Sequence, residues 1–112
     1  MLKKDVLRGQ KAFDNVFSRG KSKGDRFIVV FYLRNNLEYS RTAFIASKKV
    51  GNSVVRNRAA RLMKESYRQI RDSIDSGYDI VFISRSTITD CKCQDVLKSM
   101  KSAVRRAGLS DK

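Results

Sequence analysis

Residues 48–71 place a row of cations and a row of apolar side chains on different sides of one predicted helix. Either Asn52 or Ser53 can cap the first turn of this helix. At about 100° per residue, the apolar side consists of Val55, Ala59, Leu62, Met63, Tyr67, Ile70 and Ile74. Such a helix must pack on a core through one side and leave its cationic side at the surface.

The other elements are predicted from shorter patterns. Phe13, Val16 and Phe17 recur at helical spacing, which predicts a helix over about residues 10–18. Apolar runs predict strands over residues 27–33, 42–47 and 78–84, the first two of them antiparallel neighbours. Asp90 is expected to cap a last helix that ends at Gly108. The buried stripe of that helix is expected to be Cys93, Val96, Leu97, Met100, Val104 and Ala107.

The element order is therefore α-β-β-α-β-α, which predicts an α+β fold with a single small sheet. One domain spanning residues 1–112 is expected for a chain of this length. The middle helix joins two strands as a βαβ crossover, and the general rule makes that crossover right-handed. No apolar run is long enough for a membrane span or a secretory signal, so a soluble, cytoplasmic protein is expected.

The cationic side of the middle helix predicts a polyanionic partner. Asn57, Arg61, Lys64 and Arg68 follow one another at helical steps, Arg58 flanks them, and Arg56 lies near the apolar border. Lys48 and Lys49 add charge before the helix N-terminus, and Glu65 is the only acidic residue between Val50 and Asp72. The whole chain carries a formal charge of +14. RNA, DNA and an anionic membrane all remain candidates at this point, and a solubility role is the simplest alternative.

Groups for catalysis are missing. The chain has no His, and its carboxylates show no paired spacing. Cys91 and Cys93 are separated by one residue, which is too few for the usual zinc pairing, so two ordinary reduced thiols are expected. No catalytic residue and no protein-bound metal site are predicted.

Aromatic side chains indicate a second surface. Phe13 and Phe17 lie one helical turn apart, and Phe31 belongs to a strand that is apolar on both faces. Three helices have to cover the sheet, so part of one face is expected to stay open as a stacking platform for unpaired bases.

Two motifs resemble the bacterial ribonuclease P protein subunit. The first is Phe13-Asp14-Asn15-Val16-Phe17-Ser18-Arg19-Gly20. The second is Ser47-Lys48-Lys49-Val50-Gly51-Asn52, followed by Val55-Arg56-Asn57-Arg58 and Arg61-Leu62. The match is looser at Ile83-Ser84-Arg85-Ser86, which lacks the proline often found after that arginine.

The resemblance implies that a large RNA cleaves the 5′ leader from precursor tRNA, using magnesium ions bound mainly by the RNA. Arg56, Asn57, Arg58, Arg61 and Lys64 would contact the catalytic RNA, and the charge pattern adds Lys48, Lys49 and Arg68. Phe13, Phe17 and Phe31 would line a cleft for the single-stranded leader. The implied fold resembles the second domain of ribosomal protein S5, with a left-handed crossover.

The expected partners are thus the catalytic RNA and the precursor tRNA leader, with no DNA and no membrane. The alternative is a general or ribosome-associated RNA-binding protein without an enzyme role. A nuclease that acts without RNA is disfavoured by the missing catalytic groups.

Overall fold

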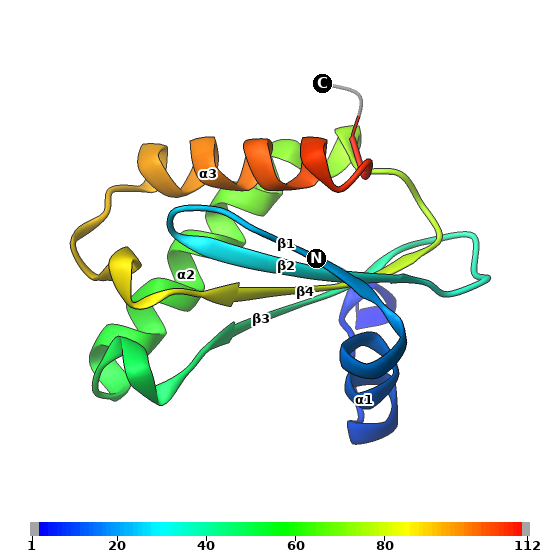
Figure 1. The fold of residues 1–112 in the computed structure, drawn as a ribbon, viewed down its shortest axis with the longest axis horizontal. Coiled ribbons are helices and arrows are strands. Elements are labelled where there is room, and N and C mark those ends of the chain that lie inside the picture. Colours follow the sequence, from blue (N-terminus) through cyan, green and yellow to red (C-terminus); the bar gives the residue numbers. More distant parts are fainter. Residues whose placement is uncertain (1–2, 111–112) are drawn as a thin grey trace.

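A four-stranded sheet with helices on both faces forms the protein (Figure 1). The computed structural model describes residues 3–110. The helices are α1 (Gln10–Arg19), α2 (Ser53–Ile70) and α3 (Cys93–Arg106). The strands are β1 (Lys21–Gly24), β2 (Ile28–Arg34), β3 (Arg41–Ala46) and β4 (Tyr78–Ser84). Short 3-10 turns are η1 (Lys3–Asp5), η2 (Lys48–Val50), η3 (Arg71–Ser73) and η4 (Ser86–Asp90). The predicted α+β class with one small sheet is confirmed.

The strand order is β1-β2-β4-β3, so the predicted pairing of the second apolar run with the first is wrong. β4 lies between β2 and β3, antiparallel to the first and parallel to the second. Four consecutive residues of β4, Asp79–Phe82, are buried. A strand that is buried on both faces takes an interior position, and β3 is left at the edge.

β1 was missed because its sequence, Lys-Ser-Lys-Gly, carries no apolar signal and all four residues are exposed. Backbone pairing with β2 defines this strand, from Lys21 opposite Tyr32 to Gly24 opposite Val29. It therefore adds a strand to the predicted order. Charged lysines are common on such a free edge because they discourage pairing with other chains.

The helix starts divide between a correct and a wrong prediction. The Asn52 side chain accepts a hydrogen bond from the Val55 N–H at 3.1 Å and caps α2 as predicted. Asp90 does not cap α3, because it is the last residue of η4 and the N-cap of α3 is Lys92. The turn η4 packs on the core through the buried Ile88. The Asp95 carboxylate instead accepts a hydrogen bond from the Lys92 N–H at 3.0 Å. Gly108 has a φ of +78° just after α3, where helices commonly end in a left-handed residue.

The two faces of the sheet are covered unequally. On the face covered by α2 and α3, the side chains of Ile28, Val30, Ile80 and Phe82 are fully buried. The opposite face, here called the α1 face, is covered by α1 on the other side of the sheet from α3 (Figure 1). On that face Val81 is fully buried, and the half-buried residues are Val29, Phe31, Leu33, Ala43, Ile45 and Ile83. Part of one face is therefore left partly exposed, as expected, and its use as a stacking platform for bases stays a prediction.

Gly20 fixes the position of α1 relative to the sheet. Its N–H donates to the Val16 carbonyl at 2.9 Å at the end of α1, and β1 begins at the next residue. A Cβ atom at Gly20 would lie 2.4 Å from the Val16 carbonyl oxygen and 2.5 Å from that of Tyr32. Because both obstacles are backbone atoms, only glycine fits between α1 and β2 here.

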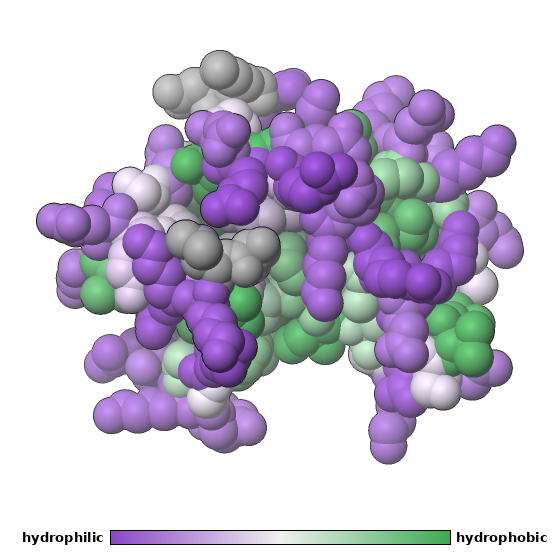
Figure 2. Space-filling model, turned by 180° about the vertical axis from the view of Figure 1, so that it is seen from behind, coloured by the Kyte–Doolittle hydropathy of each residue, from purple (hydrophilic) through white to green (hydrophobic). Residues whose placement is uncertain are grey.

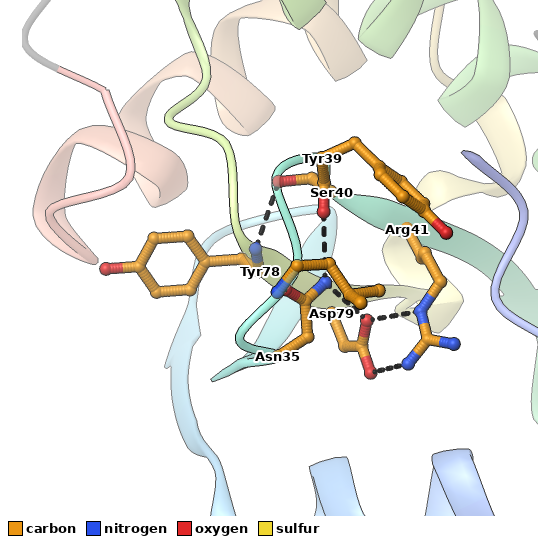
Figure 3. Close-up of polar contacts among 7 residues, drawn as sticks. Asn35, Tyr39, Ser40, Arg41, Tyr78 and Asp79 are labelled. Carbon is orange, nitrogen blue, oxygen red and sulfur yellow. Dashed lines mark hydrogen bonds and ion pairs between the residues drawn. The ribbon is translucent and has the colours of Figure 1, made fainter. Parts of the chain in front are cut away.

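A polar network fixes the starts of β3 and β4 (Figure 3). The Asp79 carboxylate accepts hydrogen bonds from Arg41 Nε at 2.8 Å and Nη2 at 2.6 Å, and from Asn35 Nδ2 at 3.0 Å. The Asp79 carboxylate raises the pKa of Arg41, against the effect of burial. Ser40 accepts from the Tyr78 N–H and donates to the Asp75 carbonyl. These bonds hold β3 in register with β4.

Candidate nucleic-acid interface

Three predicted aromatic residues meet on the α1 face. The rings of Phe13 and Phe17 are stacked with centroids 6.4 Å apart, and Phe17 meets Phe31 edge-on at 5.1 Å. Phe17 is 42% exposed, whereas Phe13 and Phe31 are half-buried. An exposed ring of this kind can stack on an unpaired base, since every base has a flat face.

Cations gather at the end of the sheet where β3 and β4 finish. Because these two strands are parallel, the residues that follow them lie at the same end of the sheet. Lys48 and Lys49 follow β3, and Arg85 follows β4, and all three are exposed. A Cβ atom on Gly24 would lie 3.5 Å from Arg85 Nη1, so this guanidinium reaches over to β1. A phosphate chain crossing the α1 face toward this end would meet positive charge.

Arg85 was not among the predicted site residues. Arg85 directly follows Ser84 at the end of the third apolar run, and a cation at the end of a predicted strand is the sequence feature that could have indicated it.

The site residues predicted on α2, five cations and Asn57, lie at the surface, and Arg56 is more buried than the others. Asn57, Arg58, Arg61, Lys64 and Arg68 are exposed, and Arg56 is half-buried. The Nε atom of Arg56 is buried and has no hydrogen-bond partner in the described part of the chain. A buried donor without an acceptor is costly.

The cations of α2 contact different parts of the fold on two sides of the helix. Arg58 donates from Nη1 to the Thr89 carbonyl at 3.1 Å and from Nη2 to the Cys91 carbonyl at 2.7 Å. Its guanidinium therefore ties α2 to the turn η4. On another side of α2, Arg61, Lys64 and Arg68 face the edge strand β3, where they line a groove together with Arg71.

The acid–base properties of the described residues suit binding rather than catalysis. Hydrogen bonding to Arg68 lowers the pKa of Glu65, so the one carboxylate on this stretch stays charged and paired. Both cysteines are free, and burial raises the pKa of the Cys91 thiol, which keeps it protonated. Within residues 3–110, no three His, Cys, Asp or Glu side chains lie close enough to form a metal site. No helix of that range is both long and apolar enough to cross a membrane.

Comparisons with known proteins agree with one another. A family model described as Ribonuclease P matches residues 1–108. The ribonuclease P protein component of Pelotomaculum thermopropionicum is 42% identical over 106 residues, covering 95% of each chain. That of Clostridioides difficile is 43% identical over 105 residues, covering 93% of this chain and 92% of the relative. The solved ribonuclease P protein from Thermotoga maritima superposes with a TM-score of 0.82 at 28% identity, covering 90% of this chain and 96% of that one.

Proposed function

Since this chain belongs to the bacterial ribonuclease P protein family, the protein component of an endoribonuclease that processes transfer RNA, we propose that it carries two RNA-binding surfaces. One, on α2 and η2, binds the catalytic RNA. The other, on the α1 face, binds the single-stranded 5′ leader of precursor tRNA in the cytoplasm. The observation that carries the proposal is the partly exposed cluster of Phe13, Phe17 and Phe31 on the α1 face, on a sheet whose end after β3 and β4 carries exposed cations.

The surface for the catalytic RNA consists of cations and one amide that precede and follow the α2 N-terminus, all of them exposed except the half-buried Arg56. Lys48, Lys49, Arg56, Asn57, Arg58, Arg61, Lys64 and Arg68 are the residues proposed for it. Arginine pairs with phosphate through two donors at once, and lysine acts as a point charge. With a net charge of +14, the protein relieves repulsion between the phosphates of the catalytic RNA and those of the substrate.

The surface for the leader consists of Phe13, Phe17 and Phe31, together with Arg85 at the end of the sheet where β4 finishes. Base–aromatic stacking contributes about 1–3 kcal/mol per base and tolerates many sequences. That tolerance suits a protein that meets leaders of different sequence. The magnesium ions are bound mainly by the RNA, and within residues 3–110 the protein presents no cluster of carboxylates for a metal.

Reconstitution with a bacterial ribonuclease P RNA tests the first surface. Cleavage of a leader-bearing precursor tRNA is measured across magnesium concentrations, with and without the protein. The protein should move half-maximal cleavage to lower magnesium, because its cations replace part of the screening. An unchanged magnesium dependence would contradict the proposal.

Phe17→Ala tests the second surface, with Leu37→Ala as a matched control. Leu37 is 38% exposed, close to the 42% of Phe17, but it lies in the loop between β2 and β3. Phe17→Ala should weaken holoenzyme binding of precursor tRNA by about 5- to 150-fold, the equivalent of one stacked base. Binding of mature tRNA should not change, and Leu37→Ala should leave both affinities unchanged. Equal losses for precursor and mature tRNA would show that Phe17 acts through folding alone.

A further inference from the structure

A groove of about 680 Å³ lies between the outer edge of β3 and the side of α2. Its volume falls within the range of about 300–1,000 Å³ typical of small-ligand sites. Val6, Phe44 and Tyr67 supply apolar lining, and the cations around it are Arg61, Lys64, Arg68 and Arg71. Figure 2 shows apolar surface gathered near the centre of its view, with hydrophilic side chains on both sides.

The four cations of the groove differ in their partners. Arg68 forms an ion pair with Glu65, and Arg71 Nη2 lies 3.5 Å from the Asp5 carboxylate. Neither Arg61 nor Lys64 has an ion-pair or hydrogen-bond partner among residues 3–110. Two neighbouring turns of α2 thus present unpaired positive charge beside an apolar floor.

The backbone of β3 adds hydrogen-bonding groups to the same groove. The Leu7 N–H donates to the Thr42 carbonyl at 3.0 Å, so the backbone of Thr42 faces the outer edge of the sheet. Backbone groups alternate in direction along a strand, and therefore the N–H and C=O of Phe44 face that edge too. No backbone group of the described residues pairs with Phe44 on its outer side. One donor and one acceptor side by side match the Watson–Crick edge of a nucleobase.

We propose that this groove binds one unpaired nucleotide of the catalytic RNA. The base lies against Val6 and the edge of Phe44, with its Watson–Crick edge on the Phe44 backbone, and its flanking phosphates lie on Arg61 and Lys64. The inference rests on the proposed docking of that RNA on α2. It adds that the RNA offers a base here, and not only the backbone of a duplex, whose stacked bases cannot enter an apolar groove.

An acidic peptide adding a strand to β3 is the competing occupant. The observations favour a nucleotide, because a base and a phosphate use the apolar floor and the two unpaired cations together. A peptide strand would have to alternate acidic and apolar side chains to do the same.

Val6→Trp tests the inference, because it fills the groove without changing its charge. Gln94→Trp is the matched control, an equal addition at an exposed position of α3. Each protein is bound to a bacterial ribonuclease P RNA over a range of salt concentrations. Dimethyl sulfate and a carbodiimide, which together modify the Watson–Crick edges of all four bases, then report which unpaired bases the protein protects. Val6→Thr keeps the shape of valine and serves as a second variant if tryptophan prevents folding.

Wild-type protein should protect at least one unpaired base that becomes reactive again with Val6→Trp. The affinity of Val6→Trp should fall by about 5- to 150-fold with an unchanged salt dependence, because a base contact and no phosphate contact is lost. Val6→Thr should give a smaller loss of the same kind, and Gln94→Trp should match the wild type. Wild-type affinity and protection with Val6→Trp would overturn the inference and favour the peptide. A wild-type protein that did not bind the RNA would overturn the proposed function itself.

Discussion

Replacing Arg58 by methionine removes two hydrogen bonds and keeps most of the apolar stem. The lost bonds run from the guanidinium to the carbonyls of Thr89 and Cys91, at 3.1 and 2.7 Å, and they tie α2 to η4. A hydrogen bond from a charged group contributes about 1.5–3 kcal/mol when it is shielded from water. Arg58 is exposed, so we expect the two together to contribute about 2 kcal/mol. For a chain of this size, that loss lowers Tm by about 8 °C.

Arg61→Met is the matched control, one turn further along α2. Arg61 is exposed and has no partner within residues 3–110, so its replacement should change the free energy of unfolding by less than about 0.5 kcal/mol. It should instead reduce the salt slope of catalytic-RNA binding by about 0.7–0.9, the share of one phosphate contact. Thermal and urea unfolding measure stability, and filter binding across salt concentrations measures the slope. Arg58→Met unfolding at the wild-type temperature would refute the structural role of Arg58.

Three further predictions concern the fold that positions the two surfaces. Gly20→Ala should destabilise the protein by about 3 kcal/mol or more, because backbone oxygens block its Cβ, whereas Gly24→Ala, whose Cβ would make only ordinary contacts, should change Tm little. Arg41→Met should lower the free energy of unfolding, measured with urea, by about 3–5 kcal/mol, because it leaves the 8%-exposed Asp79 carboxylate without its charged partner. A decrease below about 1 kcal/mol would mean that water replaces the arginine. Burial raises the pKa of Asp25, but hydrogen bonds from Ser99, the Arg26 N–H and Arg106 outweigh it and hold the pKa below 3.8. Asp25→Asn should therefore have a lower free energy of unfolding than the wild type, by the same amount from pH 7 down to about pH 4 and by less as the pH falls further. A difference between the two proteins that did not change with pH would show that the charge of Asp25 contributes nothing.

The helices and the central strands could be predicted because their apolar residues recur at helical spacing or form an uninterrupted run. The stripe on α2 is an example: Ala59, Met63, Tyr67 and Ile70 are buried as the periodicity requires. The neighbours of each strand could not be predicted in the same way. Pairing of β3 with β4 depends on contacts between residues about 38 positions apart, such as Arg41 with Asp79, and no local pattern encodes them.

The candidate site shows the same division between local and long-range information. Helical spacing was sufficient to place Phe13 beside Phe17 and to put Arg61 and Lys64 on one side of α2. It did not show that Arg58 donates to the carbonyls of Thr89 and Cys91, or that Arg85 reaches β1. Both facts depend on where the chain returns after β4, which follows from the sheet order and not from any helix pattern.

The unequal covering of the sheet explains how a chain of 112 residues keeps a core and still exposes aromatic rings. Two helices and the fully buried side chains of Ile28, Val30, Ile80 and Phe82 form the larger core on one face. On the other face, α1 rests on a small cluster of buried residues, Leu7, Val16 and Val81. Because most of the stabilising burial lies on the first face, the α1 face can leave Phe17 exposed at little cost in stability. Substitutions of exposed residues on the α1 face should therefore change leader binding more than folding, and substitutions of buried residues on the α2 and α3 face should do the reverse.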